Sequence, residues 1–523
     1  MNVPSVVFQA NAEYGRIKIF ADVDKVTSEN VMELFSTAYM MHNQNAVKEE
    51  QLYQYERGIQ DILVREKDIR SNINEKLVIN KASQILDMHV GYCFGNPITF
   101  VQRGKVEEDL RKPETTEKED NLYIAMINKM MAEQSKAKKD TQLARDYMTC
   151  GLGYQMVWRN EKKWQYSPFK IATLNPRTTF MIYKNDAWQE PLMGCSYIID
   201  SQGSITATCY TEDTCYTIRG YSTTENTSPV LKQTVNVLGL IPIVEFEYVD
   251  RMGVFEKAIP ILNELNLVNS DRINDISQHV QSLLWMHNCL LDDEKRKQLI
   301  DGNGVIMTKS NGDGKEAKIV YLSQALDQSG VQTLSDTLKQ EVLEITSTPS
   351  WQEASGGSTT GAMQLSNGWQ SLELSAKSVE QLFAEPESRI LALVAKVIEL
   401  DNRGYAKIKD IDISDIEPHF TRNKNYDLVS KTNALSTMLN SGVDGLWAFQ
   451  TVGLFSDAEQ AYVDSREMIK KIQESKVKQD SPNNNNNANA SKDEEGNGGE
   501  NNEPKDKTEE SLQPSAVAQV ENT

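Results

Sequence analysis

Few residues of this chain could do chemistry, and none of them stands in a catalytic arrangement. Gly314 and Lys315 do not form a phosphate-binding loop, because Lys309 and Glu316 replace the required glycine and hydroxyl residue. Residues 356–360 resemble the turn that presents a nucleophilic serine until the last position, where Thr replaces Gly. The five histidines are dispersed and lack carboxylates at zinc-ligand spacing, which favours core or interface roles. We therefore expect no catalytic residue, no metal and no cofactor.

A polar loop at residues 347–361 is the first candidate contact site. It is long, rich in Ser, Thr and Gly, and set between two helical patterns, and such loops often carry function. One Trp stands in it, which is unusual for so polar a segment. The candidate residues are Ser350, Trp351, Gln352, Glu353, Ser355, Ser358, Thr359 and Thr360.

A concentration of positive charge between residues 284 and 328 is the second candidate. It could meet DNA or a partner protein. Asp292, Asp293 and Glu294 precede the first basic run, so a surface helix whose charges neutralise each other is an equal alternative. The basic residues are Lys295, Arg296, Lys297, Lys309, Lys315 and Lys318.

The bulk composition limits the kind of protein. A formal net charge of −20 excludes an ordinary DNA clamp, whose basic face neutralises phosphates. A channel for DNA has a different requirement, because an acidic wall with only local basic rings would let the DNA slide past. The alternative is that the acidic residues serve only to keep the protein soluble. No apolar run reaches the roughly 20 residues of a membrane helix. No secretory signal is evident, so the chain is expected in the cytoplasm, with its six cysteines reduced and mostly buried.

The elements that position these candidates predict an α+β fold that is mainly helical. Apolar spacing of three and four residues predicts helices, and alternation predicts an antiparallel β region at residues 151–239. The expected helices are 28–41, 44–58, 74–91, 121–148, one beginning at 254, 330–346, 362–400 with a kink or break at Pro386, and several within 427–477. The expected short strands are 304–308 and 317–322, joined by a turn at 311–314, and a pair within 405–420.

This order of elements resembles the portal proteins of tailed bacteriophages, of the siphophage type. The helix at residues 81–87 that runs into Gly-Tyr-Cys-Phe-Gly-Asn-Pro-Ile at 91–98 looks like a landmark of that family. The segments at 151–154, 174–176, 239–246 and 361–362 are similar to other landmarks. The resemblance spans roughly residues 74–477.

The resemblance implies a division of the chain into regions. They are a wing (1–253), a stem helix (254–283), a clip with a hairpin and a helix (284–328), a second stem helix (329–346), a tunnel loop (347–361), a long kinked helix and strand pair of the wing (362–425) and a crown (426–478). The composition of residues 479–523, acidic, rich in Asn and with almost no large apolar residue, predicts a disordered tail.

The resemblance also implies partners. Copies of the chain would form a homo-oligomeric ring of about twelve subunits around double-stranded DNA, bound non-specifically. The terminase large subunit, which hydrolyses ATP, a head-completion or adaptor protein, and the major capsid and scaffolding proteins would bind this ring, which is not itself an enzyme. It would be assembled in the host cytoplasm and stay at the portal vertex of the virion. The alternatives are a scaffold-like phage oligomer without a channel and a metal-dependent enzyme that uses Asp and Glu pairs.

Overall fold

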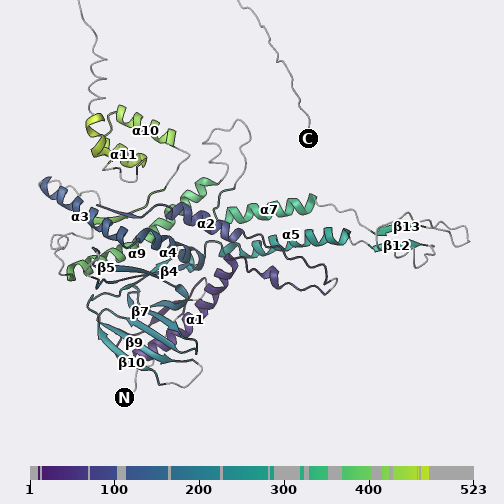
Figure 1. The fold of residues 1–523 in the computed structure, drawn as a ribbon, viewed down its shortest axis with the longest axis horizontal. Helices are drawn as coiled ribbons and strands as arrows, with labels where there is room; N and C mark the ends of the chain where they lie inside the picture. Colours follow the sequence, from purple (N-terminus) through teal and green to yellow (C-terminus); the bar gives the residue numbers. More distant parts are fainter. Residues whose placement is uncertain are drawn as a thin grey trace, which may run out of the picture. The chain divides into compact units, whose positions relative to one another are not determined.

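The computed structural model describes most of the chain as far as residue 469. The described ranges are 10–11, 15–68, 71–102, 114–162, 166–223, 228–280, 283–287, 318–322, 329–350, 368–401, 415–422, 428–455, 458 and 461–469. The chain divides into two compact units, Met1–Leu428 and Val429–Thr523. The first unit contains both helices and sheets (Figure 1), which confirms the mixed fold class.

The largest sheet has seven strands in the order β1-β2-β6-β7-β8-β9-β10. Its strands are β1 (Ala10–Asn11), β2 (Lys18–Ala21), β6 (Thr179–Lys184), β7 (Pro191–Ile199), β8 (Ile205–Tyr210), β9 (Thr214–Tyr221) and β10 (Val230–Val235). Among the described strands, only β2 and β6 pair in parallel. Helix α1 (Val31–Glu56) covers one face of this sheet, where Phe35 lies 6.1 Å from Phe180 between ring centroids. Alternation along β8 therefore places its apolar residues under α1.

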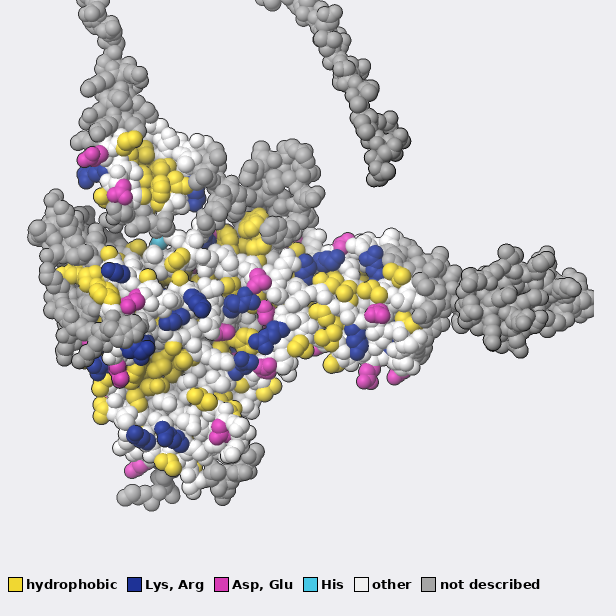
Figure 2. Space-filling view, viewed as in Figure 1, with side chains coloured by type: hydrophobic (Ala, Val, Ile, Leu, Met, Phe, Trp, Pro, Cys, Tyr) yellow, Lys and Arg dark blue, Asp and Glu magenta, His cyan; other side chains and the backbone are white. Residues whose placement is uncertain are grey.

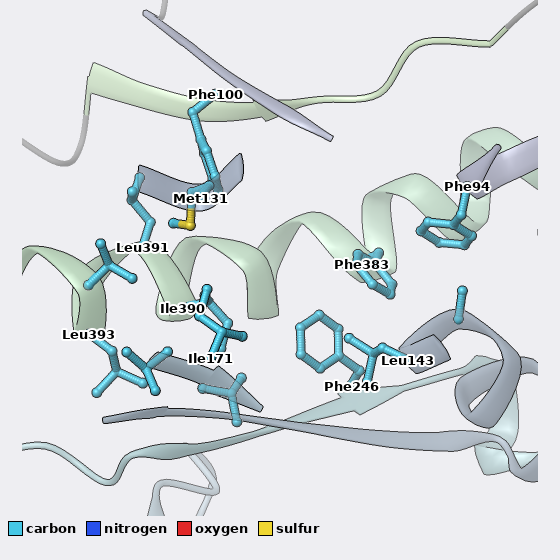
Figure 3. Close-up of a cluster of buried hydrophobic side chains, with 14 of the residues drawn as sticks. Phe94, Phe100, Met131, Leu143, Ile171, Phe246, Phe383, Ile390, Leu391 and Leu393 are labelled. Carbon is cyan, nitrogen blue, oxygen red and sulfur yellow. The ribbon is translucent and has the colours of Figure 1, made fainter. Parts of the chain in front are cut away.

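A second core forms around α9. Its elements are α2 (Lys81–Phe94), α3 (Glu114–Glu133), α4 (Lys136–Cys150), α9 (Trp369–Leu400), β3 (Thr99–Gln102), β4 (Leu152–Arg159), β5 (Phe169–Leu174), β11 (Ile243–Glu247) and β14 (Ile416–His419). Strands β11, β4 and β5 form a three-stranded sheet against which α9 packs. Phe383 of α9 lies between Phe94 and Phe246, at ring-centroid distances of 4.7 and 4.6 Å (Figure 3).

Two further helices of the first unit pack side by side (Figure 1). These are α5 (Ile259–Val280) and α7 (Ser329–Ile345), and the chain between them contains the antiparallel strands β12 (Leu283–His287) and β13 (Lys318–Leu322). The short 3-10 helices are η1 (Asp61–Val64), η3 (Pro176–Thr178), η4 (Val249–Arg251) and η5 (Glu256–Ala258). The second unit contains α10 (Leu428–Asn440), α11 (Gly445–Val452) and a helical segment at residues 461–469.

Several helix boundaries differ from the sequence-based expectation. The two helices expected at 28–41 and 44–58 form the single helix α1 (Val31–Glu56), and Asn45 within it exchanges two hydrogen bonds of 2.8 Å with the backbone of Ile17. The helix expected at 121–148 is two helices, because Ser135 takes a left-handed conformation with φ 52°. The helix expected at 74–91 begins only at residue 81, after Asn80 caps it.

Two strand pairings join segments that local patterns did not pair. β14 pairs with β3, more than 300 residues earlier in the chain, and residues 405–414 of the expected local pair lie outside the described residues. The described partner of β13 is β12, and residues 304–308 lie outside the described residues. Local alternation reveals a strand but not its partner, so long-range pairing was missed. The expectation of buried thiols is confirmed for the five described cysteines, and no helix of the described residues is apolar enough to span a membrane.

Helix α9 continues through Pro386 without a break and carries a buried charge cluster beside it. The Nζ atom of Lys136 donates to Asp140 Oδ1 and to Glu387 Oε1, both at 2.6 Å, and all three side chains are buried. Burial and the negative charge of Asp140 raise the pKa of Glu387 to about 7. The positive charge of Lys136 lowers this pKa but does not cancel the increase. Two carboxylates thus compete for one ammonium group inside the core.

Replacing Glu387 with Gln should flatten the dependence of stability on pH. Because the pKa of Glu387 rises from 4.5 to about 7 on folding, its contribution to stability is fully present below 4.5 and is lost as the pH rises through about 7. The urea midpoint of wild type should therefore fall more than that of Glu387→Gln between about pH 5 and about pH 8. Glu385→Gln, an exposed change on the same helix, is the control. Identical pH profiles for wild type and Glu387→Gln would contradict this account.

Candidate functional site

Two of the predicted contact residues lie in the described part of the chain. Ser350 is half-buried after α7, and Lys318 is exposed at the first position of β13, opposite His287. The other predicted residues lie outside the described residues: Trp351, Gln352, Glu353, Ser355, Ser358, Thr359, Thr360, Lys295, Arg296, Lys297, Lys309 and Lys315. The structure therefore describes the base of the polar loop and the helices that lead to and from β12 and β13.

The described residues at the two ends of the polar loop, Pro349 near its start and Gly368 beyond its end, lie side by side. After α7 the chain turns back, and Thr348 donates its N–H to the carbonyl oxygen of Leu343 at 2.8 Å. Gly368, the residue before α9, has a φ of 81°, and a β-carbon placed there would lie 3.7 Å from Cα of Pro349. The described residues that flank 351–367 therefore lie next to each other.

A buried histidine of α2 holds the first end of the loop. The Nε2 atom of His89 lies 2.8 Å from the carbonyl oxygen of Thr346 and 3.3 Å from Oγ1 of Thr348. Burial lowers the pKa of His89 to about 4, so its ring is neutral near pH 7. Because a carbonyl oxygen can only accept, Nε2 carries the proton and donates to Thr346. This bond fixes the backbone where the loop begins.

Three residues further along α2, Tyr92 holds the second end. Its hydroxyl donates to Glu373 Oε2 of α9 at 2.5 Å, and its ring lies 6.1 Å from that of Trp369 between centroids. Arg422 forms ion pairs with Glu373 and Glu380 and lies 5.8 Å from the Tyr92 ring centroid. Residues three apart share one face of a helix, so α2 anchors both ends of the loop.

Helix α5 carries a ladder of buried polar side chains. Asn266, Ser270 and Asn274 recur at every fourth position and are at most 1% exposed. They bind residues 75–79, an extended segment that we call the strap. The bonds join Ile79 N to Asn266 Oδ1 (2.8 Å), Leu77 N to Ser270 Oγ (2.9 Å) and Glu75 N to Asn274 Oδ1 (2.7 Å). Every fourth residue of the helix thus meets every second residue of the strap.

Helix α7 covers another side of α5. Asn269 Nδ2 donates to Ser335 Oγ at 3.0 Å, and the first turns of α5 pack in an apolar cluster that includes Leu262 and Val342. Apolar side chains of the two helices also remain exposed to solvent: Ile276 (46%), Leu334 (49%) and Ile345 (48%).

The joint before α5 is built on the buried side chain of Arg251. Its Nε donates to the carbonyl oxygen of Arg16 at 2.9 Å, and its Nη1 donates to Glu245 at 2.9 Å and Glu247 at 3.0 Å. Burial alone would raise the pKa of Glu245, but the attraction and hydrogen bonding of Arg251 lower it. Gly151 has a φ of 78°, and a β-carbon there would lie 2.3 Å from the carbonyl carbon of Arg251. Only glycine permits this close approach.

The surface of the described residues mixes both signs of charge. Figure 2 shows Lys and Arg side chains interspersed with Asp and Glu over the visible face. No group of three His, Cys, Asp or Glu that could hold a metal ion occurs among the described residues. The described residues position other segments rather than perform chemistry. Helix α2 binds the chain on both sides of residues 351–367, and α5 packs between the strap and α7.

Sequence reasoning did not find these anchors. His89 and Tyr92 look like ordinary residues of an amphipathic helix, and nothing local indicates that they meet Thr346 and Glu373. The ladder is visible in the sequence. Asn266, Ser270 and Asn274 are small polar residues four positions apart, and this spacing indicates a buried polar stripe along one face of the helix.

Replacing His89 with Leu should loosen the first end of the loop. The carbonyl oxygen of Thr346 would lose its closer donor, His89 Nε2 at 2.8 Å, and keep the hydroxyl of Thr348 at 3.4 Å, at a cost of about 1 kcal/mol for one hydrogen bond. Hydrogen–deuterium exchange should rise at residues 346–350. His42→Leu is the matched control, because His42 is equally buried but bonds Arg177 instead. Unchanged exchange at residues 346–350 in His89→Leu would refute the anchor.

Removing the ladder should release the strap. In the triple variant Asn266→Ala, Ser270→Ala and Asn274→Ala, three amides lose their acceptors, each worth about 1 kcal/mol. Exchange of the amides of residues 75–79 should rise at least ten-fold. The control is Asn263→Ala on the same helix, because Asn263 bonds the side chains of Asp61 and Tyr55 and not the strap. If strap amides stay protected in the triple variant, the ladder does not hold them.

One protein family matches most of the chain. Its model, described as phage portal protein, SPP1 Gp6-like, matches residues 40–480. This range includes the strap, the ladder and both ends of the polar loop. Comparison with curated proteins finds no match.

Proposed function

Because the chain belongs to the SPP1 Gp6-like family of phage portal proteins, we propose that it forms a ring-shaped channel at one capsid vertex. DNA enters the capsid through this channel during packaging and leaves through it during ejection. The observation that carries the proposal is the family match over residues 40–480, which contains every described element from α2 to α11.

In the proposed ring, about twelve subunits make head-to-tail contacts through two different faces of each chain. The apolar side chains that α5 and α7 leave exposed, Ile276, Leu334 and Ile345, supply area for such contacts. Regions follow the division given above, with α5 and α7 as the stem, residues 284–328 as the clip, residues 347–361 as the tunnel loop and residues 426–478 as the crown.

The tunnel loop narrows the channel in this proposal. Pro349 and Gly368 lie next to each other, so the length of the chain between them limits its reach to about 30 Å from this base. Fixed ends at His89 and Tyr92 keep the base of the loop in place while its outer part follows the polymer. Ser350, Trp351, Gln352, Glu353, Ser355, Ser358, Thr359 and Thr360 make weak, non-specific contacts with DNA. A net charge of −20 on the chain keeps phosphates from binding tightly.

The clip is the proposed docking surface for partners. Its basic residues Lys295, Arg296, Lys297, Lys309, Lys315 and Lys318 face the terminase large subunit, which supplies the ATP hydrolysis, and later a head-completion or adaptor protein. The major capsid protein and the scaffolding protein surround the ring. The subunit itself has a structural rather than a catalytic role, is assembled in the host cytoplasm and stays in the virion.

Electron microscopy of the purified protein tests the channel. Rings of about twelve subunits with an axial hole wide enough for duplex DNA, about 20 Å across, are expected. Closed oligomers without a hole would favour the scaffold-like alternative instead.

Replacing Trp351 with Ala should leave ring assembly intact but slow packaging. Loss of a contact of about 1 kcal/mol slows a step about five-fold. The measurement is packaged DNA per capsid at a fixed time after infection, with rings counted separately. Trp351→Phe, which keeps an aromatic ring, should retain most packaging. Normal packaging by Trp351→Ala would remove this residue from the proposal.

A further inference from the structure

Trp188 is the most exposed large hydrophobic side chain among the described residues, at 83%. It lies in the turn between β6 and β7, at one end of the seven-stranded sheet. A single exposed apolar residue is ordinary on a protein surface. Three further observations set this one apart: the rigidity of its turn, the fastening of the turn to a second loop, and the charge around it.

The turn holds Trp188 in a fixed backbone conformation. Oδ1 of Asp186 accepts the N–H of Trp188 at 3.0 Å and the N–H of Gln189 at 2.8 Å. The N–H of Lys184 donates to the carbonyl oxygen of Glu190 at 2.8 Å and closes the turn. Such side-chain bonds to the local backbone preorganise a turn, so little backbone entropy remains to be lost on binding.

A second loop fastens this turn from the side. Asn185 donates its side-chain amide to Asp22 at 2.7 Å and its backbone N–H to the carbonyl oxygen of Ala21 at 3.2 Å. The ammonium group of Lys184 lies 3.2 Å from Asp24 Oδ1, and the hydrogen bond with Asp24 raises the pKa of Lys184. The indole is therefore presented by a turn that is bonded to a second loop.

The surroundings of Trp188 are acidic. We call Trp188 with the nearby carboxylates the Trp188 patch; the carboxylates are Asp22, Asp24, Asp186 and Glu190. Lys184 pairs with Asp24 and Asp186 of this group, and its single positive charge leaves the patch with a net charge of −3. The side chain of Asp24 is 96% exposed, so its charge faces solvent.

Packing does not account for Trp188. At 83% exposure the indole buries little area, and it has no aromatic contact within the described residues. Trp158 is different, since it is half-buried and lies 5.6 Å from the ring of Tyr210. An indole that contributes little to folding but is rigidly displayed is typical of an anchor for binding.

We propose that the Trp188 patch docks an arginine- or lysine-containing segment of another protein. A cation stacks on the exposed face of the indole, the best aromatic acceptor for cation–π contacts, while neighbouring cations of the same segment pair with Asp24 and Glu190. The negative charge of the patch repels DNA phosphates and anionic lipid surfaces. A second copy of this chain, with its net charge of −20, is a poor occupant for the same reason.

Fluorescence anisotropy on the purified full-length protein tests this proposal without reference to the channel. The probe is a labelled peptide of alternating arginine and serine, and the control peptide has glutamate for arginine. Trp188→Ala should weaken binding of the basic peptide about three-fold or more, as expected for loss of an exposed cation–π contact. The double variant Asp24→Asn and Glu190→Gln should also weaken it and should reduce its salt dependence.

Trp447→Ala is the matched control, because Trp447 is 70% exposed in the second unit and should not affect binding. All variants keep the acidic residues 480–523, so attraction of the peptide to that segment is common to every measurement. Equal affinity of wild type and Trp188→Ala would overturn the proposal. So would equal losses in Trp188→Ala and Trp447→Ala, which would indicate general adhesion to exposed indoles.

Discussion

The buried guanidinium of Arg251 is the interaction on which the arrangement of the first unit depends. It joins the segment before β2 through Arg16 and the three-stranded sheet through Glu245, and it does so a few residues before α5 begins. A buried arginine without these acceptors would be very costly, so the charge requires all of these elements to be in place at once. Gly151 has no side chain, so its backbone can lie directly against the backbone of Arg251. The direction in which α5 leaves the sheets follows from this joint.

Helix α2 performs a comparable role for the polar loop. His89 and Tyr92 lie on one face of α2 and reach two segments that are distant in sequence, at the end of α7 and the start of α9. The residues that hold the base of the loop are thus a buried histidine and a half-buried tyrosine, whereas the residues proposed to touch DNA belong to the segment between α7 and α9 in sequence. This division separates positioning from contact, as in many proteins whose functional loops stand on a rigid scaffold.

Much of the fold could be predicted from the sequence, but its long-range contacts could not. Apolar periodicity predicted α7 and the β region correctly, because those patterns are set by burial of one face. It extended the helix at residues 74–91 through the strap, since extended backbone that bonds to helix side chains has no local signature. The pairing of β14 with β3 and the anchors at His89 and Tyr92 were missed for the same reason. The family was predicted from short phrases at residues 81–98 and elsewhere, and the match over 40–480 confirms it.

The two repeats that meet in the ladder between α5 and the strap differ slightly in length. Four residues of an α-helix advance about 6.0 Å, and two residues of an extended chain advance about 6.6 Å, so each rung adds an offset of about 0.6 Å. Over three rungs the accumulated offset is about 1.2 Å, yet the three bonds stay between 2.7 and 2.9 Å, so small adjustments of the chain absorb it. Position 262, the next along the series, is a buried Leu, and the strap ends nearby at the Asn80 cap of α2. The ladder therefore stops where α5 offers no further acceptor and the backbone of the strap passes into a helix.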